Sequence, residues 1–485
     1  MLSTLDPIVG PSGEKVSQRP FWLFITACII CVGAALLMDA PVIALLPAGV
    51  LFGLYALVNV KQLYYLFFFL LPFSIEVELP GGFGTDLPSE PIMILLTGLC
   101  IVLLIKNLST LPKAYFVHPI SILLYAHVAW IFVTAIFSMH PFISFKFFMA
   151  KIWYVVPFFI MPFLLFKEEK DYKKLFMYLG AGVFIAITFV LVKHAGKGFS
   201  FDSSNKVVRP IFRNHVNYAI LLLSFLPYLI YLTLRTHSYR WVKYFAVAIM
   251  LVAIYLTYTR AAQLSVVLAI MIWLMLRWQL SKYAIGLGLI FGILFVGFLC
   301  TDNRYLDFAP DFEKAVQHRK FDNLVEATTK MQDISTVERF YRWIAGFYMV
   351  GNKPILGYGP STFYTEYKKH TVTSYKTYVS DNPEKSGIHN YYLMTAVEQG
   401  IPGFLILMSI IILTILYGER CLVTLQDRQS KWLIIAATIT FILINIVLLI
   451  NDLLEADKVG PFFFLSMSII VFFSCQNQVK LKKNA

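Results

Sequence analysis

The chain has 485 residues, of which 58% are hydrophobic and 14% are charged, and its formal net charge at pH 7 is +13. Soluble globular proteins usually carry about 25% charged residues. The charge deficit and the many apolar runs near 18 residues long exclude an ordinary soluble enzyme and predict a polytopic membrane protein. The six cysteines lie in or beside apolar runs, without metal-ligand spacing or a paired framework.

Apolar runs separated by short polar segments are the candidate membrane spans. The first run follows Arg19 and no small-residue cleavage site comes after it, so we expect a retained helix. The third and fourth runs are short for a bilayer. The predicted spans are 21–38, 42–60, 62–75, 91–105, 119–138, 147–166, 175–192, 217–234, 241–258, 262–276, 283–300, 401–417, 432–450 and 460–474.

The charges between the spans predict the orientation of the chain. With a cytoplasmic N-terminus, the inner segments hold 20 Lys and Arg against 7 Asp and Glu, and the outer segments hold 21 of each. The whole net charge then lies inside, as the positive-inside rule requires. Basicity is therefore a topology signal, and no nucleic-acid partner is expected. We expect an all-α, polytopic transmembrane helical bundle of about 12–14 spans, with both termini cytoplasmic.

The longest polar stretch, residues 301–403, falls on the predicted outer side. Capping-box spacing at Ser335 opens a helical pattern that Gly351 and Pro354 end. We expect this stretch to form a small helical cap outside the membrane. Shorter helical candidates within it are 311–330 and 361–369.

Cations on the outer side oppose the positive-inside tendency and are candidate functional groups. Arg260 lies in a tight turn between two apolar runs, Arg209 and Arg213 lie in one outer loop, and Lys151 lies at the outer end of a span. Guanidinium groups bind phosphate oxygens with paired hydrogen bonds, so a lipid diphosphate at the membrane rim would fit them. A snorkelling or salt-bridged side chain is the alternative for each.

His389 lies where the chain re-enters the membrane and is followed by Asn390. Histidine is the commonest general base near neutral pH, although a histidine at a helix start is often a cap or a polar contact. Glu398, nine residues on, lies half a turn away, so we expect it to be a cap or packing residue. Arg339 has Trp343 four residues on as a cation–π partner, which favours packing over substrate contact.

Several short motifs occur in order on the predicted outer side. They are Phe212-Arg213-Asn214-His215-Val216-Asn217, Tyr258-Thr259-Arg260-Ala261, Arg339-x-x-x-Trp343, Asn352-x-Pro354-x-x-Gly357-x-Gly359-Pro360, His389-Asn390-x-x-Leu393 and Gly400-x-x-Gly403. As an ordered set they resemble the O-antigen ligase and polymerase superfamily, over under half of the chain. Thr259 stands where serine is common in that family, and His215-Val216 where proline or glycine is frequent.

The resemblance implies a metal-independent, inverting glycosyltransferase of the bacterial inner membrane that uses an undecaprenyl-diphosphate-linked glycan, has a periplasmic active site and needs no cofactor. The family's essential arginines would correspond to Arg260 and Arg213, with Arg209 as the alternative to Arg213. Its histidine would correspond to His389. Further candidate substrate contacts are Lys151, Arg339 and Asn390.

We expect the reaction to be O-antigen ligation to lipid A core in lipopolysaccharide biosynthesis. Within the superfamily, the alternatives are an O-antigen or exopolysaccharide polymerase, or transfer to a protein hydroxyl. From other classes, the alternatives are a transporter or flippase of lipid-linked glycans, or a non-catalytic assembly protein. A transporter would favour charges at mid-membrane and two related halves, which the sequence does not suggest.

The predicted organisation has five parts, in which membrane lipids surround the helical segments. They are a cytoplasmic tail (1–20), N-terminal transmembrane helices (21–192), an O-antigen ligase-like catalytic region (193–417, including the periplasmic loop 301–389), C-terminal transmembrane helices (418–474) and a basic cytoplasmic tail (475–485).

Overall fold

The computed structural model describes residues 25–34 in part, 46–79, 83–235, 240–301, 334–371 and 387–484. The predicted span 21–38 lies largely outside the described residues, and the helical candidate 311–330 lies wholly outside them. The chain divides into two units, Met1–Tyr64 and Tyr65–Ala485. The first unit contains α2 (Leu46–Val58) and the start of α3 (Val60–Leu70).

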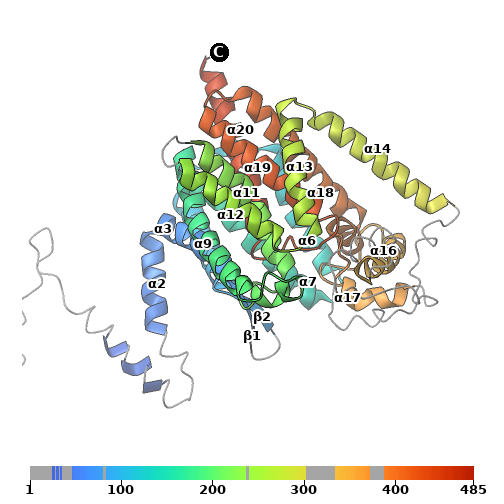
Figure 1. Ribbon diagram of the computed structural model, residues 1–485, viewed down its shortest axis with the longest axis horizontal. Coiled ribbons are helices and arrows are strands. Elements are labelled where there is room, and N and C mark those ends of the chain that lie inside the picture. Colours follow the sequence, from blue (N-terminus) through green and yellow to red (C-terminus); the bar gives the residue numbers. More distant parts are fainter. Residues whose placement is uncertain are drawn as a thin grey trace, which may run out of the picture. The chain divides into compact units, whose positions relative to one another are not determined.

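The second unit is a bundle of α-helices (Figure 1). Among the described residues, eight helices are long and apolar enough to cross a membrane, so the chain is a multi-pass membrane protein. This confirms the all-α prediction. The helices are α4 (Ser89–Lys106), α5 (Lys113–Phe116), α6 (Pro119–Ile136), α7 (Pro141–Val155), α8 (Met161–Leu165), α9 (Glu169–Ala195), α10 (Ser204–Val207), α11 (His215–Arg235), α12 (Arg240–Tyr255), α13 (Arg260–Arg277), α14 (Ser281–Cys300), α16 (Ile334–Asn352), α17 (Phe363–Glu366), α18 (Tyr391–Thr424), α19 (Arg428–Val447) and α20 (Gly460–Asn484).

Helix α19 is the central helix of this unit and packs against α11, α13, α18 and α20 (Figure 1). Of its most apolar window 78% is buried, against 22% for α13. Small residues allow the close approach of α18, because a Cβ on Gly418 would lie 2.5 Å from Thr438 Oγ1. Close backbone packing of this kind stabilises helix pairs in lipid. Burial of apolar side chains against another helix is hardly more favourable there than contact with lipid.

Many span boundaries agree with the prediction to within a few residues, but α9, α18 and α20 extend well beyond the spans predicted at 175–192, 401–417 and 460–474. Two other spans differ in an informative way. The predicted span 62–75 is shorter, because α3 ends at Leu70 and a 3₁₀ turn, Leu71–Phe73, follows. The predicted span 147–166 is longer and irregular: α7 passes through a π-helical segment, Val156–Ile160, into α8. Pro157 and Pro162 explain the irregularity, since proline removes a helical N–H donor.

A two-stranded hairpin precedes α4 and was not predicted. Strands β1 (Ile75–Leu79) and β2 (Phe83–Leu87) pair antiparallel, with Val77 opposite Thr85. The predicted spans 62–75 and 91–105 leave most of this stretch as a loop. Apolar and acidic residues alternate through β1, which is the usual signal of a half-exposed strand.

Segments distant in sequence meet at one end of the bundle, here called the loop-rich end. Between α19 and α20, Asp457 Oδ2 accepts a hydrogen bond of 2.9 Å from Ser89 Oγ at the start of α4. Lys458 Nζ donates to the Ser74 carbonyl (2.8 Å) beside β1. The same ammonium lies 5.3 Å from the Phe212 ring centroid, in the segment between α9 and α11. The α19–α20 loop therefore ties the hairpin to that segment.

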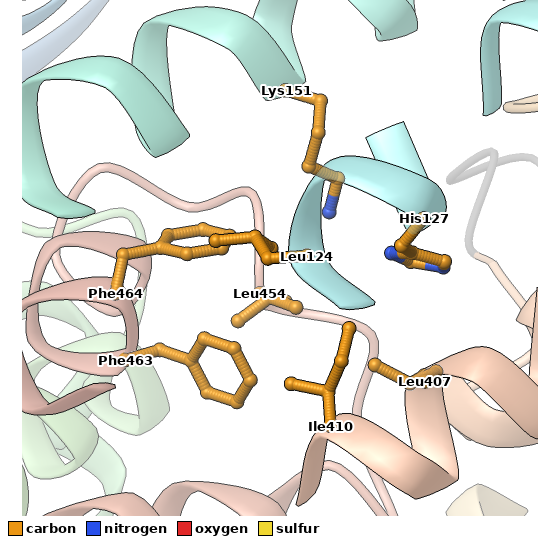
Figure 2. A pocket seen from close by; sticks show the side chains of 8 residues that line it. All are labelled: Leu124, His127, Lys151, Leu407, Ile410, Leu454, Phe463 and Phe464. Atoms are coloured by element: carbon orange, nitrogen blue, oxygen red, sulfur yellow. The ribbon is translucent and has the colours of Figure 1, made fainter. Parts of the chain in front are cut away.

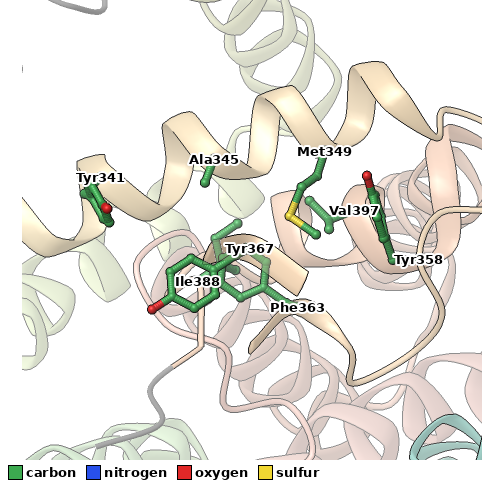
Figure 3. Close-up of a cluster of buried hydrophobic side chains, with 8 residues drawn as sticks. All are labelled: Tyr341, Ala345, Met349, Tyr358, Phe363, Tyr367, Ile388 and Val397. Atoms are coloured by element: carbon green, nitrogen blue, oxygen red, sulfur yellow. The ribbon is translucent and has the colours of Figure 1, made fainter. Parts of the chain in front are cut away.

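Residues 334–371 and 387–390 form the helical cap. Helix α16 ends at Asn352, as the prediction from Gly351 and Pro354 required, and α17 with the 3₁₀ turn Tyr367–His370 occupies the predicted range 361–369. In Figure 3 one face of α16 points toward α17, the chain before α18 and the first turns of α18. The buried side chains there are Tyr341, Ala345, Met349, Tyr358, Phe363, Tyr367, Ile388 and Val397.

Helix α18 has a kink at Gly400, the first glycine of the Gly400-x-x-Gly403 motif, where φ is +71° and ψ is 178°. The cap segment after α16 fits into this kink. Tyr358 N donates to the Val397 carbonyl (3.0 Å), and Ile401 N donates to the Pro354 carbonyl (2.7 Å). The kink therefore leaves backbone N–H and C=O groups of α18 without partners inside the helix. The cap segment forms hydrogen bonds with these groups.

Glu398, just before the kink, fixes α17. Its carboxylate accepts hydrogen bonds from Ser361 N (2.8 Å) and Phe363 N (3.1 Å), which are unsatisfied donors at the start of that helix. This confirms the prediction that Glu398 is a cap residue. Gly357, with φ +67°, lies against it, and a Cβ there would be 2.5 Å from the Glu398 carbonyl carbon. These contacts explain the glycines between α16 and α17.

Candidate active site

His389 lies at the mouth of α18, two residues before the helix begins at Tyr391. Its φ of +55° is uncommon for a residue other than glycine. Asn390 is the N-cap, and its side-chain oxygen accepts a hydrogen bond from Leu393 N (2.9 Å). His389 is thus held at a sharp turn between the helical cap and the bundle.

Two side chains of α16 hold the chain that leads into His389. Arg342, which is 2% exposed, donates from Nη1 to the Gly387 carbonyl (2.9 Å). Trp343 Nε1 donates to the Ile388 carbonyl (3.0 Å). Consecutive carbonyls before His389 are therefore anchored to one helix, which explains the tryptophan in the Arg339-x-x-x-Trp343 motif.

Asp452, in the α19–α20 loop, faces His389. The distance from His389 Nδ1 to Asp452 Oδ1 is 3.6 Å, an ion-pair distance, and Nδ1 has no hydrogen-bond partner among the described residues. Burial raises the pKa of Asp452, but the neighbouring His389 outweighs burial and lowers it below the ordinary value. Gly387 makes room for this carboxylate, because a Cβ there would lie 1.9 Å from Asp452 Oδ2.

The α19–α20 loop carries three acids, each with a different partner. Asp452 faces the histidine, Glu455 pairs with Lys151 of α7, and Asp457 accepts from Ser89. None of these three acids was among the predicted site residues. The sequence nevertheless indicates that this loop could contribute to a site. Three acids between two apolar spans require partners when the loop is buried.

Lys151 is 1% exposed, and its ammonium contacts Glu455 and donates to the Tyr391 hydroxyl (3.0 Å). Figure 2 shows it beside His127 at a cavity of about 10 Å³, which is room for about one water. The cavity is too small for a sugar or a phosphate group. The other lining residues are Leu124, Leu407, Ile410, Leu454, Phe463 and Phe464.

Arg213 and Arg209 lie exposed in the segment between α9 and α11. Arg213 Nε is 3.6 Å from Glu76 Oε2 of the hairpin. The Arg209 carbonyl accepts a hydrogen bond of 2.6 Å from Lys193 Nζ. The structure therefore places the Arg213 guanidinium group beside the hairpin and the Arg209 backbone beside Lys193.

Arg260 is the first residue of α13, directly after the α12–α13 turn. In that turn Tyr258 has φ +53°, and its hydroxyl donates to the Phe199 carbonyl (2.6 Å). The turn before Arg260 is thus fastened to the segment that carries Arg213. The α19–α20 loop contacts that segment through Lys458 and Phe212 and contacts His389 through Asp452. Contact of Arg213, Arg260 and His389 with one substrate stays a prediction.

Comparison with protein families finds a match over part of the chain. The O-antigen ligase family model matches residues 245–408. This region is an O-antigen ligase domain. The match confirms, for roughly a third of the chain, the resemblance to the O-antigen ligase and polymerase superfamily, whose members are glycosyltransferase-like enzymes. No curated protein matches the chain.

The matched domain holds only part of the predicted site. Arg260, Arg339, His389 and Asn390 fall inside residues 245–408. The remaining candidate side chains and the histidine's partner come from segments that flank this region, namely helix α7, the segment between α9 and α11, and the α19–α20 loop. They are Lys151, Arg209, Arg213 and Asp452.

Two arginines of α16 lie in the O-antigen ligase domain, and the structure gives a clear contact to the one that was not predicted. Arg342, which sequence reasoning did not single out, holds the chain before His389. Arg339 is half-buried, and its contact with substrate stays a prediction. Within the ranges that the structure describes, no group of three or more His, Cys, Asp or Glu side chains could hold a metal ion.

Proposed function

We propose that this protein transfers a glycan from undecaprenyl diphosphate to an acceptor hydroxyl, at the periplasmic face of the bacterial inner membrane. The observation that carries the proposal is the His389–Asp452 pair in a membrane bundle, in which His389 belongs to the region matched by the O-antigen ligase family. A histidine oriented by a carboxylate is a general base for activating a hydroxyl.

In the proposed reaction the acceptor oxygen attacks C1 of the donor sugar. The new O–C1 bond forms as the bond from C1 to the diphosphate oxygen breaks, and the leaving diphosphate takes the electron pair. His389 Nε2 takes the acceptor's proton, because Nδ1 faces Asp452. Asp452 orients the ring and stabilises the imidazolium. General base catalysis of this kind contributes about 10²–10⁴-fold, and a single displacement inverts C1.

The leaving diphosphate gains negative charge, and Arg260 and Arg213 are the groups proposed to stabilise it, with Arg209 as the alternative to Arg213. Preorganised cations at a developing charge act most strongly where water is excluded. Guanidinium groups stay protonated and bind phosphate oxygens in pairs, so they can take the place of a divalent metal ion. Transfer is therefore expected to continue in the presence of a chelator.

We propose lipid A core as the acceptor, which makes the reaction O-antigen ligation. An acceptor of this class is a glycan hydroxyl carried at the same membrane face as the donor. A lipid-linked repeat would serve the same chemistry, and its use would make the protein a polymerase. Asn390 and Arg339 are the proposed contacts to sugar hydroxyls near His389, in addition to the N-cap bond of Asn390.

The test uses purified protein in liposomes that contain a labelled undecaprenyl-diphosphate-linked glycan, with either lipid A core or a second lipid-linked repeat as acceptor. His389→Ala is expected to abolish transfer. His370→Ala, a substitution of another cap histidine, is the control and is expected to retain it. Transfer by His389→Ala at the wild-type rate would overturn the proposal. Movement of the lipid across the bilayer without any glycan transfer by wild type would identify a transporter instead.

A further inference from the structure

We infer that Lys151 and Glu455 form a buried positioning pair that sets Asp452 against His389. Lys151 was a candidate substrate contact, and the inference gives it a different role in the reaction. It rests on the proposed function, because it explains how the catalytic histidine acquires its geometry.

The ammonium group of Lys151 is too enclosed by protein to contact a substrate. The side chain is 2% exposed and that of Glu455 is 16% exposed. Aromatic rings cover the ammonium, with centroid distances of 5.5 Å to Phe147, 5.6 Å to Tyr391 and 5.8 Å to Phe464. The adjoining cavity of about 10 Å³ admits no group larger than a water.

The pair is linked to both members of the His389–Asp452 contact. On one side, Glu455 follows Asp452 by three residues in the same loop. On the other, Tyr391 follows His389 by two residues, and its hydroxyl donates to Glu455 Oε1 (2.7 Å). Glu455 is therefore the point at which the loop and the start of α18 are joined.

A backbone contact completes this joint. Tyr391 N donates to the Leu448 carbonyl (3.0 Å), at the other end of the α19–α20 loop. Lys151 adds the positive charge that permits a carboxylate at this depth, since a buried ion without a partner is strongly unfavourable. Removal of the ammonium would force Glu455 toward water and shift the loop that carries Asp452. A misplacement of about 1 Å can cost about a hundredfold in rate.

A positioning pair has a signature that a substrate-binding lysine lacks. Loss of one partner leaves the other charge buried and unpaired, whereas replacement of both removes the unfavourable charge. We therefore compare Lys151→Met, Glu455→Gln and the double variant K151M/E455Q. Methionine keeps the length of the lysine stem among the rings, and glutamine keeps an acceptor for Tyr391.

The measurement is kcat and donor KM for glycan transfer in liposomes, per amount of monodisperse protein. Each single variant is expected to lower kcat by about 10- to 100-fold with little change in KM, and the double variant to recover most of kcat. Lys170→Met removes the exposed Lys170–Glu168 pair, which is 2.7 Å long, and is the matched control with unchanged kcat.

Two kinetic results would overturn the inference while leaving the proposed function intact. One is a raised donor KM in Lys151→Met that Glu455→Gln does not correct, which would show that Lys151 binds substrate. The other is wild-type kcat in all variants. An inactive wild type would refute the proposed function instead. In that case the structure of Lys151→Met by electron cryomicroscopy decides the inference, because the distance between His389 and Asp452 must then exceed 3.6 Å.

Discussion

Substitution of Gly400 by alanine tests the joint between the helical cap and α18. The backbone there, at φ +71° and ψ 178°, is in a region open almost only to glycine, and its cost for another residue is about 1–3 kcal/mol. The new Cβ would also lie 2.0 Å from the Ile355 carbonyl oxygen. A backbone atom cannot rotate away, so the cap segment must move.

That movement breaks the hydrogen bond from Ile401 N to the Pro354 carbonyl, which is 2.7 Å long. Its loss adds about 0.5–1.5 kcal/mol. Gly400→Ala is therefore expected to lower the free energy of unfolding by about 1.5–4.5 kcal/mol. The assay is thermal unfolding of the detergent-solubilised protein, followed by tryptophan fluorescence.

Gly351→Ala is the matched control for this prediction. Gly351 lies in α16, its Cβ would meet nothing within 4 Å, and alanine favours a helix over glycine by about 1 kcal/mol. The control is expected to unfold at or slightly above the wild-type temperature. Equal unfolding temperatures for Gly400→Ala and Gly351→Ala would refute the account of the kink.

Three further predictions follow from the site. Burial, with nearby acids, raises the pKa of Asp86 to about 7 in spite of Lys458, so its ionisation destabilises the fold as pH rises from about 4 to about 7. Asp86→Asn should raise the unfolding temperature at about pH 8 and not at about pH 4; an equal effect at both would contradict this. Trp343→Phe removes the donor to the Ile388 carbonyl and should cost about 1–3 kcal/mol in unfolding free energy, with a lower kcat; unchanged denaturant unfolding would count against it. Arg260→Lys keeps the charge and loses the paired donors, so transfer kinetics should place it between wild type and Arg260→Ala; a rate equal to wild type would exclude a bidentate role.

The membrane bundle was predictable because its signal is composition and length, which do not depend on tertiary contacts. The cap helix α16 was predictable for a related reason: its apolar residues recur at helical spacing between clear stop signals. The strands β1 and β2 were missed because five residues of alternating pattern are outweighed by their acidic composition. The end of α3 was also missed, because the apolar run continues past Leu70, where the helix ends.

Within the candidate site, the place of His389 just before a helix could be predicted from sequence, whereas its catalytic role stays a prediction. Asp452 could not be predicted, since it lies 63 residues after His389 and only the packing of α18 against α19 brings them together. Arg342 was overlooked in favour of Arg339 for a similar reason. Tertiary packing determines which side of α16 faces the chain before His389, and helical spacing in the sequence does not reveal it.

The central claim is that arginines at the loop-rich end hold a lipid-borne diphosphate beside an imidazole. A structure of the protein with bound undecaprenyl diphosphate tests it most directly. The account predicts diphosphate oxygens in contact with Arg260 and Arg213, and the oxygen that carried the sugar directed toward His389 Nε2. A diphosphate bound elsewhere, or a separation of Arg260 from His389 too large for one donor to touch both, would contradict it.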